Sequence, residues 1–248
     1  MKISSIKTHS VLANSETLNS LLDTYITSLT EYSVVAITSK VVSLCEGSVV
    51  SVEDATKEAL VVQESQFYLP KEFNSYGFNF TITRNTMIAS AGIDLSNGNG
   101  KYILWPRDPQ QSANVIRKHL SEIHHIKHLG VIIVDSKTIP LRWGTVGTSI
   151  AHSGFKALND YRGTKDLFNY DMRVTKANIA EGLAATSVLA MGEGAESTPI
   201  VVIENPPHIV YQNRDPTPEE LKDGSLTMED DLYAPILKAA PWKKGQQS

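Results

Sequence analysis

The strongest pattern along the chain is a continuous β-branched run, residues 131–134, which predicts a strand buried on both of its faces. Shorter runs of β-branched and aromatic residues predict more strands, at residues 3–11, 33–37, 76–93 (strand, turn, strand), 102–105 and 199–203. Apolar residues three or four positions apart predict helices instead, at residues 17–29, 53–65, 109–126 and 175–190. The irregular order of strands and helices argues against a regular doubly wound sheet.

The connection after the strand at 33–37 contains a second apolar step, residues 41–42, which places Lys40 between two strands. Lys40 is then either a phosphate contact or a solvated lysine, and without further context the solvated lysine is the commoner case. The sequence pattern leaves both interpretations of Lys40 open.

Polar residues mark where two of the helices begin. Asp108 precedes Pro109, an order typical of a helix start, so we assign Asp108 to capping. Thr175 is placed to cap the alanine-rich helix that follows it, and Gly192 is placed to end that helix.

The composition changes after Asn205, where prolines and acidic residues replace the apolar runs. Within this part, residues 217–220 have the pattern of a short helix start. We therefore divide the chain into a body, residues 1–204, and a proline-rich C-terminal arm, residues 205–248, that lies over the body or over a partner subunit. The last six residues of the arm, 243–248, are expected to be frayed.

Composition and charge exclude several classes of protein. With 41% hydrophobic and 20% charged residues, the chain resembles an ordinary globular protein. Its net charge of −4 and its lack of a long basic run argue against a nucleic-acid-binding face. Cys45 is the only cysteine, which excludes a disulfide framework and fits a reducing cytoplasm. No segment has an apolar leader pattern or the roughly 20 apolar residues of a membrane span, so we expect a cytoplasmic protein without membrane contact.

Candidate chemistry follows directly after the run at 131–134. Asp135 and Ser136 come first, then Arg142 and three glycines, at positions 144, 147 and 154. This combination suits a phosphate chelated by a metal ion at the end of a strand. The stretch offers a carboxylate, a permanently charged arginine, and glycines whose backbone a ligand can approach closely. The alternative is that Asp135 and Ser136 simply cap a turn.

Two other acidic residues are candidates for the same chemistry. Asp94 opens a polar loop rich in Asn and Gly, where a role in the turn and a role in ligand binding are evenly matched. Glu193 lies between two glycines, after a helix and before a strand. A GxG in that position is no dinucleotide fingerprint, so Glu193 is either a ligand or an ordinary loop acid.

Taken in order, several motifs resemble the coenzyme F420-0:L-glutamate ligase family of γ-glutamyl ligases. The motifs are TSKVVSLCEG, AGIDLSN, ILWPRDPQQSA, GVIIVDS followed by PLRWGTVGTSIA, DYRGTKDLF and MGEG. They cover residues 34 to about 203. Each motif alone is weak, but their order and spacing are specific.

The resemblance implies an α+β fold with mixed sheets and an intertwined homodimer. It also implies a ligase that depends on GTP, or on ATP, and on Mg²⁺ or Mn²⁺. Such an enzyme joins L-glutamate to a carboxylate of a cofactor-like acceptor through an acyl phosphate, and its main work is positioning and charge neutralisation.

The resemblance further assigns roles to residues of this chain. The metal ligands are Asp94, Asp135, Ser136 (a threonine in the family) and Glu193. The nucleotide contacts are Ser39, Lys40, Asn97, Gly192, Glu193, Gly194, Ala195, Glu196, Ser197 and Thr198. The catalytic residues are Asp94, Asp135 and Arg142.

The chain also departs from the family pattern. Leu44 stands where the family has a lysine that contacts the nucleotide, and Lys40 is placed to take over its charge. A homologue that binds nucleotide and metal without catalysis, as a sensor or a partner subunit, is therefore the alternative to an enzyme. The intact residues favour the enzyme, namely Asp94, Asn97, Asp135 and Glu193.

The acceptor is expected to be a folate rather than F420-0. The reason is the stretch 137–143, which lacks the Gly-Arg of the family and adjoins the expected metal ligands. That stretch would line the acceptor pocket.

Overall fold

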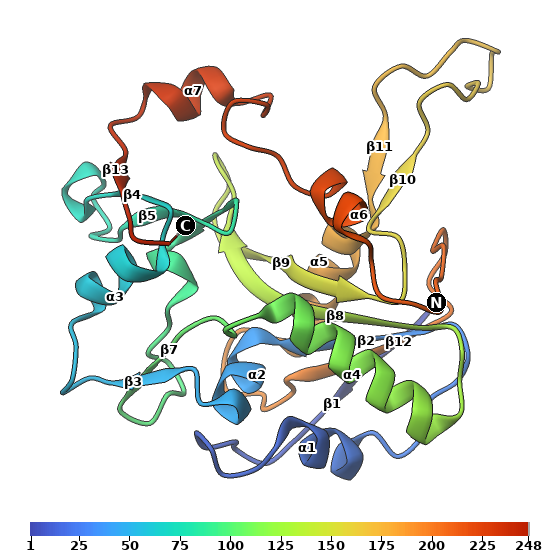
Figure 1. Ribbon diagram of the computed structural model, residues 1–248, viewed down its shortest axis with the longest axis horizontal. Coiled ribbons are helices and arrows are strands. Elements are labelled where there is room, and N and C mark those ends of the chain that lie inside the picture. The colour runs from blue at the N-terminus through green and yellow to red at the C-terminus, as the bar shows by residue number, and fades with distance from the viewer. Residues whose placement is uncertain (248) are drawn as a thin grey trace.

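The computed structural model describes residues 1–247, and its centre is a five-stranded mixed sheet (Figure 1). The strands in their order across the sheet are β1 (Lys2–Ile6), β12 (Ile200–Glu204), β2 (Ser33–Thr38), β8 (Leu129–Thr138) and β9 (Thr145–Ser153). Strands β2 and β8 are parallel, whereas the other neighbours are antiparallel. The expected mixed α+β class is therefore confirmed.

Helices cover both faces of this sheet. On one face, α1 (Leu18–Tyr25) and α4 (Pro109–His124) pack on Val131 and Ile133 of β8. On the other face, α5 (Ile179–Met191) packs on Ile132 and Val134. Successive side chains of a strand point to opposite faces, so the run at 131–134 is buried on both sides, as its sequence predicts.

The segment after β2 is a helix, α2 (Ser39–Glu46), so the prediction of a second strand there was wrong. Val42 packs into the core under α1 and α4, whereas Val41 and Leu44 pack on a separate cluster with Leu21. Gly47 ends the helix at a positive φ of 70°. Two adjacent valines are buried because the helix lies between two packing surfaces, which a short apolar step does not reveal.

Strand β8 does not end at Asp135 and Ser136 but continues to Thr138, where it pairs with Thr145 of β9. Gly147 lies inside β9 because α5 approaches closely: a Cβ at Gly147 would lie 2.2 Å from the carbonyl oxygen of Ala184. Close packing of α5, rather than the expected approach of a ligand, therefore requires a glycine at position 147.

A smaller sheet lies beside the body, with strand order β13 (Lys243–Lys244), β4 (Phe67–Leu69), β5 (Phe80–Thr83) and β6 (Thr86–Ala89). The β5–β6 pair confirms the strand–turn–strand unit expected at 76–93. Helix α3 (Lys57–Glu64) packs on the short turn that follows β6. A two-stranded ribbon of β3 (Val49–Ser51) and β7 (Lys101–Ile103) completes this part of the chain.

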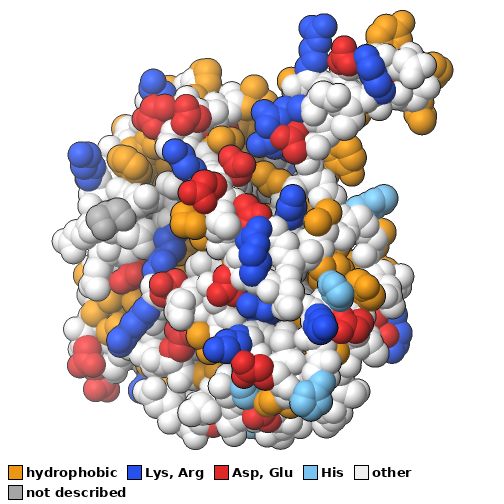
Figure 2. Space-filling view, turned by 45° about the vertical axis from the view of Figure 1, so that its right-hand side comes forward, with side chains coloured by type: hydrophobic (Ala, Val, Ile, Leu, Met, Phe, Trp, Pro, Cys, Tyr) orange, Lys and Arg blue, Asp and Glu red, His pale blue; other side chains and the backbone are white. Residues whose placement is uncertain are grey.

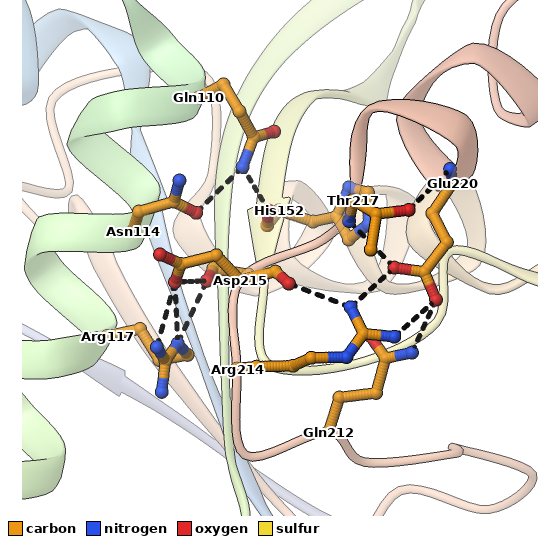
Figure 3. Close-up of polar contacts among 10 residues, drawn as sticks. Gln110, Asn114, Arg117, His152, Gln212, Arg214, Asp215, Thr217 and Glu220 are labelled. Carbon is orange, nitrogen blue, oxygen red and sulfur yellow. Dashed lines mark hydrogen bonds and ion pairs between the residues drawn. The ribbon is translucent and has the colours of Figure 1, made fainter.

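The C-terminal arm is tied to its own chain at both ends. Near its start, Asp215 accepts hydrogen bonds from the buried Arg117 (2.8 Å) and from Ser153 (3.1 Å), as Figure 3 shows for the arginine. The next helix, α6 (Pro218–Asp223), confirms the helix start predicted at 217–220 and begins with a capping box between Thr217 and Glu220. Helix α7 (Ala234–Ala239) then leads to β13.

The end of the arm was predicted to be frayed, and for residues 243–247 this was wrong. Lys243 and Lys244 pair with β4, and the backbone N–H groups of Gln246 and Gln247 donate to carbonyls of Val62 and Ser65. Ser248 lies outside the residues that the structure describes. Within residues 1–247, no helix is both long enough and apolar enough to cross a bilayer.

A hairpin of β10 (Leu158–Asp160) and β11 (Lys176–Asn178) projects from the body (Figures 1 and 2). Apolar side chains near its end are largely exposed, namely Leu167, Phe168, Tyr170 and Val174. The hairpin also corrects one cap, because Asn178 rather than Thr175 caps α5, by accepting from the N–H of Glu181. Thr175 lies too early because β11 occupies the residues between it and the helix.

Candidate active site

A pocket of about 340 Å³ lies where the parallel strands β2 and β8 end. Five segments line it: residues 8–11, the start of α2, residues 97 and 103, the end of β8, and the loop 192–198 that follows α5. The carboxyl ends of parallel strands are a common place for ligands in sheets with helices on both faces.

Most residues assigned by sequence to metal or nucleotide line this pocket. They are Lys40, Asn97, Asp135, Ser136, Gly192, Glu193, Gly194, Ala195, Glu196, Ser197 and Thr198. Segments that are more than a hundred residues apart in the sequence therefore meet at one site.

Asp135 is half-buried, and both of its carboxylate oxygens accept hydrogen bonds. Oδ1 accepts from the N–H of Ser136 at 2.8 Å, and Oδ2 accepts from the indole N–H of Trp105. Burial raises the pKa of Asp135 to about 6, although both hydrogen bonds oppose that rise. A carboxylate that costs this much to ionise gains more than an exposed one from a cation placed beside it.

Asp94 already has such a cation. Its Oδ2 lies 2.5 Å from the ammonium nitrogen of Lys40, which also donates to Ser96 at 3.1 Å. The N–H of Ser96 donates to Oδ1 of Asp94 at 2.8 Å. Burial alone would raise the pKa of Asp94, but the bonds from Lys40 and Ser96 outweigh it, so the pKa lies below its usual value.

Glu193 meets the end of β8 from the other side. Its carboxylate accepts from the hydroxyls of Ser136 (3.3 Å) and Thr145 (3.0 Å). Neighbouring residues on a strand point to opposite faces, so Asp135 meets Trp105 while Ser136 meets Glu193. The three acidic residues consequently do not converge: within residues 1–247, no three His, Cys, Asp or Glu side chains are grouped so as to hold a metal ion.

The loop 192–198 forms one wall of the pocket and is braced internally. The carboxylate of Glu196 accepts from the N–H of Gly194 at 2.8 Å, and the hydroxyl of Thr198 donates to the carbonyl of Met191 at 2.5 Å. The N–H of Thr8 donates to the carbonyl of Ser197 at 2.9 Å, which ties the N-terminal wall to this loop.

Three of the predicted residues do not line the pocket, although one of them, Asp94, contacts its wall through Lys40. Arg142 is exposed on the turn between β8 and β9, and its guanidinium donates to the adjacent carbonyl of Leu141 at 2.8 Å. The continuation of β8 beyond Ser136 carries Arg142 out of the pocket lining, so the structure does not support its catalytic assignment. Ser39 is buried in the first turn of α2 and does not line the pocket.

Several residues of the site were not predicted from the sequence. Thr8, His9 and Ser10 line the pocket although no pattern marks them. Trp105 and Thr145 bind the acidic residues from other elements. One feature of the sequence could have pointed to Trp105. The N–H of a buried indole needs a hydrogen-bond acceptor, and the acidic residues predicted at strand ends could supply one.

The donor groups around the pocket suit an anion bound together with a hard cation. Lys40 is the one lysine or arginine that lines it in the described part of the chain. Helix α2 starts at this pocket, and no side chain caps its first N–H groups, which therefore remain available to an anion. Carboxylate and hydroxyl oxygens are the donors that Mg²⁺ and Mn²⁺ prefer.

Comparisons with known proteins show the family of the chain. The family model described as F420-0:Gamma-glutamyl ligase matches residues 1–205. A protein named coenzyme F420:L-glutamate ligase from Methanococcus maripaludis is 34% identical over 206 residues, which cover 77% of this chain and 82% of the relative. One of the same name from Methanopyrus kandleri is 34% identical over 194 residues, covering 70% and 75%.

Other relatives match over a shorter stretch. A second M. maripaludis protein of that name is 41% identical over 134 residues, so the match spans about half of each chain, 53% of this one and 54% of the relative. Because the family model matches most of the chain, the resemblance inferred from the motifs is confirmed: this protein belongs to the F420-0:gamma-glutamyl ligase family.

Proposed function

We propose that this protein is a nucleotide-dependent γ-glutamyl ligase that joins L-glutamate to a carboxylate of a cofactor-like acceptor. The observation that carries the proposal is the pocket itself, which gathers Lys40, Asn97, Asp135, Ser136 and the loop 192–198 at the ends of β2 and β8. The relatives' name, coenzyme F420:L-glutamate ligase, supports the reaction class.

In the proposed reaction, the γ-phosphoryl group of GTP, or of ATP, passes to a carboxylate oxygen of the acceptor, and the nucleoside diphosphate leaves. The amine of glutamate then attacks the acyl carbon, inorganic phosphate leaves, an amide forms and the amine loses a proton. Lys40 and the start of α2 neutralise phosphate charge, and the apolar wall of Val188 and Met191 excludes water from the acyl phosphate.

We propose that Asp135 and Asp94 would hold Mg²⁺ or Mn²⁺ at the end of β8, and that Lys40, which pairs with Asp94, would bind a phosphate. Such an ion usually takes one or two carboxylates and completes its shell with water and substrate phosphates, so a ready-made group of three carboxylates is not required. When bound, it would polarise the transferred phosphoryl group. Ser136 and Glu193, which meet at the same strand end, would supply further oxygen ligands.

For the acceptor, we propose F420-0 ahead of a folate. The case for folate rested on residues 137–143 lining the acceptor pocket, and none of them lines the pocket at the ends of β2 and β8. Leu141 and Trp143 instead stand almost fully exposed on the β8–β9 turn, 94% and 89%. The description of the family, F420-0:Gamma-glutamyl ligase, supports F420-0.

The test is a reaction of the purified protein with radiolabelled L-glutamate, Mn²⁺ and either GTP or ATP. F420-0 and tetrahydrofolate are offered separately as acceptors. We expect labelled F420 with one added glutamate and one nucleotide consumed per amide formed. Nucleotide binding without turnover on any acceptor would instead support a homologue that has lost catalysis, which is the reading that Leu44 on the pocket wall favours.

We further propose that the protein is a homodimer and that the hairpin of β10 and β11 is part of the contact. The C-terminal arm, which first suggested the dimer, is tied to its own chain and lends it no support. The projecting hairpin does, because Leu167 and Phe168 are 96% and 79% exposed near its end.

The dimer predicts that Leu167→Ser with Phe168→Ser lowers the molar mass of the protein in solution. Light scattering at micromolar concentration should give twice the chain mass for the wild type and the chain mass for the variant. Leu141→Ser, an equally exposed leucine on the other turn, is the control and should stay dimeric. A monomeric wild type would contradict the proposal.

A further inference from the structure

Trp105 and Asp94 reach the site as one unit. The segment between them folds back on itself, and Asp94 and Ile103 exchange two backbone hydrogen bonds, at 3.0 and 2.8 Å. Asp94 thereby comes to Lys40 while Trp105, two residues after Ile103, comes to Asp135. The position of one side chain therefore depends on that of the other.

The seat of the Trp105 indole is made by a glycine. Gly92 has a φ of +71°, and a Cβ placed on it would lie 2.3 Å from the indole nitrogen of Trp105. Glycine suits position 92 for two reasons. It adopts the left-handed backbone conformation without strain, and it has no side chain to collide with the indole ring. The ring itself is buried, 6% exposed.

The indole N–H is directed at one carboxylate oxygen of Asp135. Trp105 donates to Oδ2 while the N–H of Ser136 donates to Oδ1, so the carboxylate is held at both oxygens and cannot rotate freely. Each oxygen keeps a second lone pair for another partner, and Asp135 lines the pocket. Trp105 does not line the pocket, and an indole N–H has no lone pair for a cation.

We propose that Trp105 is a positioning residue, seated by Gly92, that orients the carboxylate of Asp135 toward a divalent cation. The inference rests on the proposed function only for the presence of that cation. Hydrogen bonds from outside a metal site orient its ligands, and their loss typically weakens metal binding about 10- to 100-fold. A tryptophan that only fills the core would contribute to stability without affecting the affinity for the cation.

The test compares Trp105→Phe with wild type by Mn²⁺ titration, followed by electron paramagnetic resonance, with and without GTP. Phenylalanine keeps most of the ring and removes the N–H. We expect the dissociation constant for Mn²⁺ to rise about 10-fold or more. Trp242→Phe is the matched control, because its indole also donates a hydrogen bond, to Leu237 at 2.6 Å in the C-terminal arm, and it should bind Mn²⁺ like wild type.

A second variant reaches the same interaction from the other side. Gly92→Ala places a methyl group against the indole nitrogen, so it should weaken Mn²⁺ binding as Trp105→Phe does. Thermal unfolding of each variant without metal separates a stability loss from a loss of affinity. Wild-type Mn²⁺ affinity in folded Trp105→Phe would overturn this inference alone, whereas a wild type that binds no Mn²⁺ even with GTP would overturn the proposed metal site as well.

Discussion

Asp135→Asn is expected to reduce turnover by roughly 100- to 1,000-fold or more, because the neutral amide no longer attracts a cation beside the transferred phosphoryl group. Asp135 is the carboxylate for which burial raises the pKa to about 6, so its charge is costly without a cation nearby. Steady-state turnover with GTP, glutamate and F420-0 measures the effect. Near-normal metal-dependent turnover of this variant would refute the site.

The same substitution should leave the stability of the protein nearly unchanged. Burial makes the charge of Asp135 costly at neutral pH, and the neutral Asn removes that cost. Asn has one acceptor oxygen where Asp135 has two, so the N–H of either Trp105 or Ser136 loses its partner, at about 1–3 kcal/mol. The two effects offset each other.

The pH dependence of unfolding gives an independent check on Asp135. Between its ordinary pKa of 3.8 and about 6, the folded state holds a proton that the unfolded chain has released. The contribution of this group to the free energy of unfolding therefore decreases as pH rises through that window, and Asp135→Asn should lack the decrease.

Asp108→Asn, at the cap of α4, is the control for the turnover measurement, because Asn caps a helix about as well as Asp.

Lys40→Met should give the second-largest effect, a loss of roughly 10- to 100-fold in nucleotide affinity together with a loss of turnover. Among the described residues, Lys40 supplies the one lysine or arginine charge on the pocket wall, where Leu44 has replaced the lysine of the family pattern. Its ammonium also pairs with Asp94 at 2.5 Å. Fluorescent GTP binding and Mn²⁺ titration report the two roles separately.

Lys71→Met is the matched control for Lys40. Lys71 forms an ion pair of similar length, 2.8 Å to Glu58, on the surface of the small sheet and away from the pocket. Its loss should leave nucleotide binding unchanged. Lys40→Met should cost at most about 1 kcal/mol of stability, because the pair with Asp94 is partly exposed and screened. Unchanged GTP affinity in Lys40→Met would show that nucleotide does not bind beside α2.

Much of the fold could be predicted from local pattern. The run at 131–134 predicted a strand buried on both faces, and Asp108 with Pro109 predicted the start of α4. Both predictions succeed because burial and helix capping each select residue types at neighbouring positions. Segment 39–46 could not be predicted in this way. Its two adjacent valines pack on different neighbours, so neither strand nor helix periodicity stands out.

The site was predictable in its composition but not in its geometry. The order and spacing of the motifs pointed to polar residues that the fold gathers around one pocket. They also placed Arg142 with Asp135, although the strand continues past Ser136 and carries Arg142 away. Where a strand ends depends on its partner, and β9 lies later in the chain.

The sequence by itself determined the family, the α+β class and the side chains available for chemistry, because these follow from residue types and their local spacing. Only the tertiary structure decided which of those side chains meet. Asp135 faces Trp105, Ser136 faces Glu193, and Lys40 rather than a third carboxylate neutralises Asp94. The physical reason is that successive residues of a strand point to opposite faces of the sheet. Only the packed structure shows which residues lie against each face.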